Sequence, residues 1–254
     1  MIQQQVAILE FDREKRAKFS PENFGKRKCL PKKCVISFSK TSTDAVAKRY
    51  GAEVRTEFWS CTANLPVYVL VYGGEEIALV CGFLGAAGAA AQIEELIAMG
   101  VEKFVVCGAA GVLTELPLGA FVVPDSAVRD EGTSFHYAPS SYEIKADQDA
   151  VQSIVQTLER EKIPYRLGKT WTTDGLYRET DEKITLRRSQ GCLTVEMEAS
   201  ALMAVAQFRG VRLAQILYGG DDLSGELYDH RDFFAQHDIR QTLVEISLKC
   251  VKNL

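Results

Sequence analysis

The chain has 254 residues, of which 46% are hydrophobic and 25% charged, and its formal net charge is −4 at pH 7. This composition is typical of a globular protein that is long enough to bury the core of one large α/β domain. With 34 acidic against 30 basic residues, the chain lacks the basic surface on which nucleic acids bind. We therefore expect no nucleic-acid partner.

The cysteines and histidines argue against disulfides and metals. Seven cysteines show no Cys-x-x-Cys spacing, and several lie in apolar runs, as at 79–81 and 105–107, which is typical of buried thiols in a reducing compartment. His136, His230 and His237 are widely separated and have no metal-ligand spacing, so we expect no metal.

The first residues are expected to form an irregular arm. The start of the chain has no basic stretch followed by an apolar one, and no apolar run is long enough to cross a membrane, which indicates a cytoplasmic protein. Residues 12–33 are polar and contain Pro21 and Pro31. We predict an N-terminal arm over 1–33 and a single domain over 34–254.

Strands and helices alternate along this domain. Apolar runs predict strands at 34–38, 67–72, 77–81, 104–107, 120–123, 166–171, 192–195 and 213–218. Helical spacing predicts helices at 43–50, 89–99, 147–161, 181–188, 197–208 and 239–252. The alternation predicts an α/β fold, with a mixed, mostly parallel central sheet flanked by helices. Gly74 and Glu75 between two strands predict an antiparallel hairpin.

A glycine-rich turn at 81–88 closes one predicted strand and opens a helix. Gly85 and its neighbours present backbone N–H groups at a helix N-terminus, where an anion binds well. The alternative is close packing of helix on sheet, which the many alanines after Gly85 favour. The spacing is not Gly-x-Gly-x-x-Gly, so it does not favour a dinucleotide.

Two further loops combine polar and aromatic residues. The segment 129–137 contains Arg129 and His136 with aromatic rings, a combination that suits stacking on a nucleobase but is also found in surface loops. The segment 172–180 follows a predicted strand, and Asp181 after it is explained equally well as a helix cap.

Acidic pairs lie at two more strand ends. Glu196 and Glu198 lie where a predicted strand gives way to a helix, and a sugar with adjacent hydroxyls is one natural partner for such carboxylates. The alternative is a solvated helix start, where acidic residues complement the helix dipole. Asp221 and Asp222 lie in a glycine-rich segment, predicted to be a turn, just beyond the strand 213–218. In open α/β sheets ligands bind at such strand ends.

Taken together and in this order, these segments resemble the nucleoside phosphorylase family, in the branch of uridine phosphorylase, hexameric purine nucleoside phosphorylase and the methylthioadenosine nucleosidases. The resemblance covers residues 34–250 and includes a glycine-rich segment at 108–111, which we predict to be a turn. It implies glycosyl transfer at the anomeric carbon of a nucleoside. It also implies a homo-oligomer, a dimer or a trimer of dimers, with His136 and the arm as candidates to cross the interface.

The resemblance also implies roles for the acidic residues. Glu198 would bind the sugar hydroxyls, Met197 would pack against the sugar and Glu196 would support the site. Asp221 would protonate or hydrogen-bond the departing base, with Asp222 as its neighbour. Cleavage of an N-glycosidic bond builds positive charge on the sugar, so anions near the ring and a proton donor at the base lower the same barrier.

The same resemblance places the base-binding residues. Thr173, Leu176 and Tyr177 would lie in the segment that contacts the base, and Arg178 would reach a pyrimidine carbonyl. His136 would lie in the substrate-binding loop. Because the two aspartates favour purines whereas Arg178 permits pyrimidines, the choice of base stays open.

The anion site departs from the family pattern. Phosphorolytic relatives hold phosphate with a Gly-Asp-Pro-x-Arg turn after the first strand, but this chain has 38–42 as Phe-Ser-Lys-Thr-Ser. Val106 and Ala109 stand where those relatives carry an arginine and a hydroxyl residue. Lys40, Arg129 and the turn at Gly85 are the candidate replacements, because a divalent anion requires charge-assisted donors.

Three interpretations follow. In the first, which we favour, the protein is a nucleoside phosphorylase with phosphate as co-substrate and no other cofactor. In the second it is a nucleosidase that uses water, and in the third a nucleoside-binding protein without catalysis.

Overall fold

The computed structural model describes residues 6–21, 29–59 and 63–254. The strands are β1 Lys33–Ser37, β2 Glu53–Trp59, β3 Asn64–Tyr72, β4 Glu75–Cys81, β5 Lys103–Val112, β6 Phe121–Asp130, β7 Glu143–Lys145, β8 Tyr165–Thr173, β9 Cys192–Glu196 and β10 Arg212–Asp222. The helices are α1 Lys40–Arg49, α2 Ala86–Ala98, α3 Gln148–Arg160, α4 Asp181–Ser189, α5 Ala199–Arg209 and α6 His237–Asn253. Short 3-10 helices include η1 Ala7–Leu9, η3 Thr133–His136 and η4 Leu176–Arg178.

The described strands form one mixed sheet. Its order is β10-β6-β8-β9-β5-β1-β4-β3-β2, with β7 beside β6. Strand β10 pairs with β5 as well as with β6, so β5, β9, β8, β6 and β10 form a closed ring of pairings. Parallel pairs join β1 to β4 and β5, β5 to β10, and β8 to β6 and β9. The other pairs are antiparallel.

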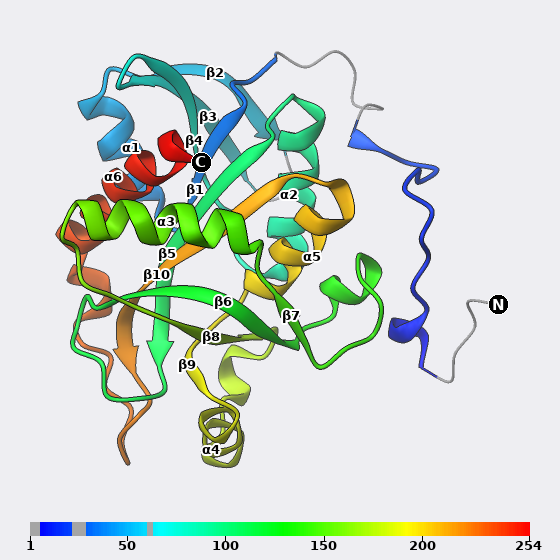
Figure 1. Ribbon diagram of the computed structural model, residues 1–254, viewed down its shortest axis with the longest axis vertical. Coiled ribbons are helices and arrows are strands. Elements are labelled where there is room, and N and C mark those ends of the chain that lie inside the picture. The colour runs from blue at the N-terminus through cyan, green and yellow to red at the C-terminus, as the bar shows by residue number, and fades with distance from the viewer. Residues whose placement is uncertain (1–5, 22–28, 60–62) are drawn as a thin grey trace.

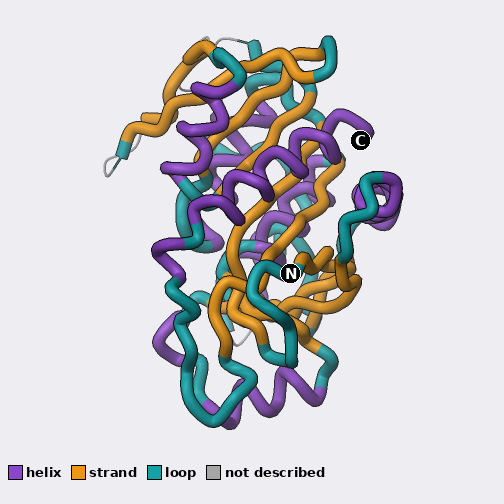
Figure 2. Tube along the Cα trace, turned by 90° about the vertical axis from the view of Figure 1, so that its left-hand side faces the viewer, coloured by secondary structure: helices purple, strands orange, loops and turns teal. Residues whose placement is uncertain are grey.

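Helices cover both sides of the strands. Helix α6 packs on β5 and β1 and contacts α1 and α3, whereas α2 and α5 pack against each other on the other side (Figure 1). Seen from the side, the strands run between the helices along the molecule (Figure 2). The largest apolar cluster of the core includes Ala199 and residues 202–206 of α5, and two smaller clusters complete the core. The carboxyl ends of β4, β8 and β9 lead into the segments 82–88, 174–180 and 197–198, and the last residues of β5 and β10 lie in the same sheet.

Local capping explains where several helices begin and end. The Ser39 side chain accepts from the backbone N–H of Ser42 at the start of α1, and Asp147 caps α3 in the same way. Thr180 caps α4. Helix α5 ends at Gly210, whose φ of +77° is the left-handed conformation that glycine favours there.

The predicted α/β fold with a mixed sheet is confirmed, and so is the hairpin, whose turn consists of Gly73 and Gly74. Sequence patterns did not predict β2 or β7. Strand β2 lies at the sheet edge, where Glu53, Arg55 and Glu57 alternate with Val54, Thr56 and Phe58, and this short charged alternation was not recognised as a strand. Strand β7 has only three residues.

Two glycine-rich segments that were predicted to be turns are strands. Residues 108–111 lie inside β5, and 219–222 lie inside β10. The reason is close packing: a Cβ on Gly219 would lie 2.6 Å from Val112, and one on Gly111 would lie 2.4 Å from Leu223. The glycines therefore leave room for neighbouring side chains within the sheet and do not mark its end.

The described part of the arm lies along the helices beside the sheet. Helix η1 contacts η3 (Figure 1), the Phe11 ring packs edge-on against Phe208, and Arg209 donates to the Lys15 carbonyl. Within the described residues, no helix has the length and apolar character that crossing a bilayer requires.

Candidate active site

The junction of β9 and α5 holds two carboxylates side by side. Glu196 ends β9 and accepts hydrogen bonds from the Thr172 hydroxyl (2.6 Å) and from the backbone N–H groups of Glu198 (2.8 Å) and Ala199 (2.6 Å). A negative charge at this point complements the N-terminus of α5. Both oxygens of Glu196 are thus committed to the protein, which suits a supporting role.

Glu198, the residue before α5, is only 5% exposed. Its Oε1 accepts from the backbone N–H of Gly85 (2.6 Å), whose φ of +85° is accessible to glycine without strain. Burial raises the pKa of Glu198, and the nearby charge of Glu196 raises it further. A ligand that donates hydroxyl groups would offset this cost, because hydrogen bonds to the ionised form favour it.

Strand β5 brings Asp221 to the same place. Gly111 of β5 pairs with Val195 of β9 and with Asp221 of β10. A Cβ on Gly111 would lie 3.1 Å from the Val195 side chain and 3.6 Å from Asp221 Oδ1. Asp221 and Val195, which precedes Glu198 by three residues, therefore flank one glycine near the end of β5.

Asp221 and Asp222 have different surroundings. Asp222 forms an ion pair with Arg231 and accepts from the backbone N–H of Ser224 (2.7 Å). Burial raises the pKa of Asp221, although the Tyr228 hydroxyl and Arg231 act against the shift. Burial thus favours the protonated form of Asp221, whereas Asp222 is engaged by Arg231.

The last residue of β8 is buried, and the segment after it continues into the exposed helix η4. Thr173 is buried, and its hydroxyl accepts from the backbone N–H of Gly175 (3.1 Å). Leu176 and Tyr177 are 48% and 94% exposed, and Arg178 is exposed too. The three side chains of η4 are therefore available to a ligand or to a second copy of the chain.

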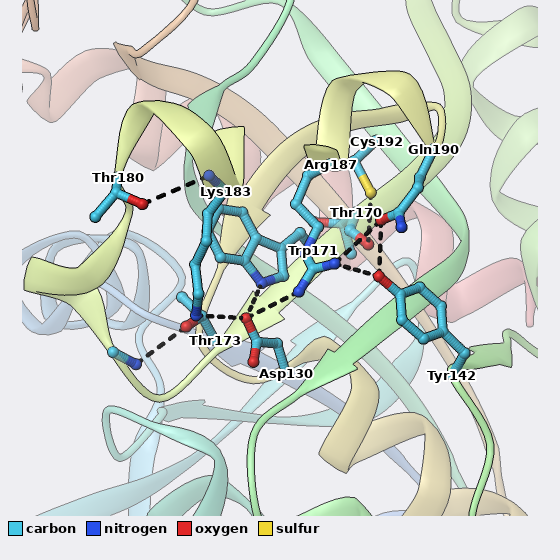
Figure 3. A network of polar contacts seen from close by, with 11 residues as sticks. Asp130, Tyr142, Thr170, Trp171, Thr173, Thr180, Lys183, Arg187, Gln190 and Cys192 are labelled. Atoms are coloured by element: carbon cyan, nitrogen blue, oxygen red, sulfur yellow. Dashed lines mark hydrogen bonds and ion pairs between the residues drawn. The ribbon is translucent and has the colours of Figure 1, made fainter. Parts of the chain in front are cut away.

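A polar network anchors this segment to the sheet (Figure 3). Asp130 Oδ2 accepts from Trp171 Nε1 (3.0 Å), Lys183 Nζ (3.1 Å) and Arg187 (3.1 Å). Burial alone would raise the pKa of Asp130, but the bonds from Lys183 and Arg187 outweigh it and hold the pKa below its usual value. Asp130 thereby ties β6 to β8 and α4.

The loop after β6 uses Arg129 internally. Its guanidinium donates to the Ser134 hydroxyl (2.9 Å), the Pro139 carbonyl (2.7 Å) and the Ser141 hydroxyl (2.7 Å), and it stacks over Phe135. Since these bonds occupy a buried guanidinium, we leave Arg129 out of the anion site. His136, at the end of η3, is exposed.

The place where family members hold phosphate is altered. The Phe38 ring lies so close to β4 and β5 that a Cβ on Gly82 would be 2.5 Å from it, and one on Gly108 would be 3.3 Å from it. Val106 is fully buried in the core. Lys40 is exposed and pairs with Asp44 on α1. The backbone N–H of Gly85 donates to Glu198. Of the three residues predicted to bind phosphate, Lys40 therefore remains the one whose donor group is exposed and not used in a buried hydrogen bond.

Comparison with known proteins decides the family. The family model described as the phosphorylase superfamily matches residues 32–254, nearly the whole chain. The chain belongs to the phosphorylase superfamily. The resemblance stated from the sequence is thereby confirmed.

Relatives of this superfamily member are nucleoside phosphorylases. It is 32% identical over 146 residues to a guanosine phosphorylase of Halorubrum lacusprofundi, a match that covers 57% of this chain and 61% of the relative. It is 31% identical over 107 residues to a uridine phosphorylase of Thermococcus kodakarensis, covering 42% of this chain and 39% of the relative. The chain thus spans less than two thirds of each of these proteins.

Solved structures show the same superfamily fold. The uridine phosphorylase from Vibrio fischeri ES114 has a TM-score of 0.75 at 22% identity, and the match covers 89% of this chain and 93% of that one. The purine nucleoside phosphorylase from Toxoplasma gondii, solved with immucillin-H, also has a TM-score of 0.75 at 22% identity, covering 88% and 91%.

Some residues around this site were not singled out from the sequence. Glu179 is half-buried, and burial together with the charge of Asp221 raises its pKa to about 7. Glu131, Thr172 and Ser200 form hydrogen bonds behind Glu196 and Glu198. Nothing in their spacing shows burial, since an acidic residue in a loop is normally solvated. In the described part of the chain, no group of three or more His, Cys, Asp or Glu side chains is arranged to hold a metal.

Proposed function

We propose that the protein cleaves the N-glycosidic bond of a nucleoside, with phosphate as the nucleophile. The observation that carries the proposal is the pairing of Gly111 with Asp221 of β10 and with Val195 of β9, the strand that leads directly to Glu198. Positive charge that develops on the sugar and negative charge that develops on the base are then met from opposite sides.

In this proposal each acid has a separate task. Glu198, once ionised, accepts hydrogen bonds from the sugar hydroxyls and fixes the anomeric carbon in line with the nucleophile. Met197, half-buried beside it, packs against the sugar. Burial raises the pKa of Asp221 and so favours its protonated form, which would donate to the departing base. Thr173, Leu176, Tyr177, Arg178 and His136 contribute contacts to the nucleoside.

Phosphate is proposed as nucleophile because the named relatives are phosphorylases. Lys40 at the first turn of α1 would supply the charge-assisted donor, with the positive end of that helix beside it. Hydrolysis is the second candidate. It is favoured by the Phe38 ring against Gly82 and Gly108, and by the buried Val106, since neither side chain can bind an anion.

The test is the release of free base from a panel of purine and pyrimidine nucleosides, with phosphate-free protein, in the presence and absence of phosphate. Phosphorolysis predicts release only with phosphate, with sugar 1-phosphate as product. Free sugar formed equally without phosphate would establish hydrolysis. Absence of release from every nucleoside would contradict both and favour a binding protein without catalysis.

We also propose that the protein works as a homo-oligomer, a dimer or a trimer of dimers. Large apolar side chains are exposed beside the candidate site, with Leu84 at 75% and Tyr177 at 94%. A second copy that covers them would remove apolar surface from water. Sedimentation should give a mass above that of one chain, and replacement of both residues by serine should lower it. A monomer at all concentrations would contradict the proposal.

A further inference from the structure

Glu131 is a buried carboxylate for which the proposed chemistry has no task. It lies in the turn between β6 and η3 and is 6% exposed. Its Oε2 accepts from the backbone N–H groups of Thr133 (2.6 Å) and Ser134 (2.9 Å), and its Oε1 accepts from the Ser200 hydroxyl (2.8 Å). A buried carboxylate with three donors is costly to remove from water unless these bonds are kept.

Ser200 connects Glu131 to the candidate sugar site through hydrogen bonds. Its backbone N–H donates to the Thr172 hydroxyl oxygen (2.9 Å), and that hydroxyl donates to Glu196 Oε1 (2.6 Å). Glu196 in turn accepts from the backbone N–H of Glu198 (2.8 Å). One unbroken series of hydrogen bonds therefore leads from η3, through the first turn of α5, to Glu198.

The charged and polar groups around Glu131 come from β6, β9, α5 and η3. Arg129 of β6 is the nearby cation, but its hydrogen bonds go to the loop and not to Glu131. Glu196 of β9 is the nearby anion, and the charge of Glu131 opposes its ionisation. Ser200 of α5, Thr133 and Ser134 contribute dipoles only. In the described residues no lysine or arginine forms an ion pair with Glu131.

We propose that Glu131 is a positioning residue of the active site: through Ser200 and Thr172 it fixes the start of α5 and so the placement of Glu196 and Glu198. This inference rests on the proposed function, because it gives Glu131 a part in the placement of the sugar. It also links η3, which bears His136, to the sugar-binding carboxylate. The reacting atoms are not touched by Glu131 itself.

The test compares Glu131→Gln and Ser200→Ala with the control Glu143→Gln, which removes an ion pair between Glu143 of β7 and Lys169 of β8. We expect Glu131→Gln to lower kcat about tenfold. We also expect the acid limb of its pH–kcat/KM profile to move to lower pH, because the negative charge that opposes the ionisation of Glu196 is gone. Ser200→Ala keeps the charge and should lower kcat several-fold. The control should match the wild type.

A structural role alone would reduce the amount of active protein without moving the acid limb, so an unmoved limb overturns the proposal. If Glu131→Gln does not fold, Ser200→Ala decides, since it removes a single hydroxyl, and kcat within twofold of wild type overturns the proposal. Wild-type protein that cleaves no nucleoside contradicts the proposed function, and the positioning role falls with it. Active wild type with unaffected variants overturns only the positioning role.

Discussion

Glu196 and Glu198 show how neighbouring carboxylates acquire different properties. Glu196 accepts three hydrogen bonds, two of them from backbone N–H groups at the start of α5, and these oppose the rise in its pKa that burial causes. Glu198 is equally buried but accepts the Gly85 N–H and faces the charge of Glu196. The protein thus donates three hydrogen bonds to Glu196, whereas Glu198 is left to accept further hydrogen bonds from a ligand.

Glu179 gives a prediction for stability against pH. Its pKa of about 7 in the folded protein lies above its usual value of 4.5 because of burial and the charge of Asp221. Between these two values the folded state binds the proton more tightly than the unfolded state, so its contribution to stability is full below pH 4.5 and is lost as pH rises through 7. In Glu179→Gln the side chain does not ionise, so this loss of stability with rising pH should be absent.

The measurement is the melting temperature of wild type and Glu179→Gln from pH 4 to 9. The difference between the melting temperature of the variant and that of wild type should increase between about pH 5 and 7 and then stay constant. Glu182→Gln, an exposed change on α4, serves as control. A difference between Glu179→Gln and wild type that does not vary with pH would show that Glu179 has an ordinary pKa.

At the scale of elements, Asp130 joins β6, β8 and α4 through a single oxygen. Replacement by Asn leaves Lys183 and the buried Arg187 without a counter-charge. We expect Asp130→Asn to lower the free energy of unfolding by about 2 kcal/mol, less than for a fully buried pair because Asp130 is part-exposed. Denaturant titration measures this loss.

The control for this change is Glu76→Gln, which removes an exposed ion pair with Arg55. Exposed pairs contribute little, so its free energy of unfolding should stay within about 1 kcal/mol of wild type. Equal losses in the two variants would mean that Asp130 does not anchor α4.

Packing of the glycine-containing strands gives a second prediction at this scale. A Cβ on Gly219 would lie 2.6 Å from Val112 in the core, so Gly219→Ala should destabilise the protein by about 1–3 kcal/mol. At Gly225 the nearest atom would be 3.6 Å away, and Gly225→Ala should change little. The same denaturant titration compares them, and equal stability would contradict the close pairing of β5 and β10.

At the scale of the whole molecule, apolar periodicity predicted the six α-helices and eight of the ten strands in the described part of the chain, because each buries one face or a continuous run. It failed at Gly111 and Gly219, where composition suggests a turn but neighbouring side chains require a missing Cβ. The closed ring of β5, β9, β8, β6 and β10 was not predictable, since pairing between strands distant in sequence leaves no local pattern.

Some features of the candidate site could be predicted from the sequence, and others could not. Glu196, Glu198 and Asp221 were recognisable from the motifs that carry the family resemblance, and the fold brings their strands together at Gly111. The uses of Arg129 and Gly85 within the protein were not predictable, because hydrogen bonds to loop carbonyls and to a distant carboxylate depend on tertiary structure.

The most direct test of the account is turnover of nucleosides by Glu198→Gln and Asp221→Asn, with circular dichroism to show that both variants fold and with the exposed Glu102→Gln as control. We predict that kcat/KM falls at least about hundredfold in both variants, because each loses a charge or a proton that the transition state requires, whereas the control keeps wild-type activity. Folded variants that both retain wild-type turnover would contradict the assignment of this strand end as the active site.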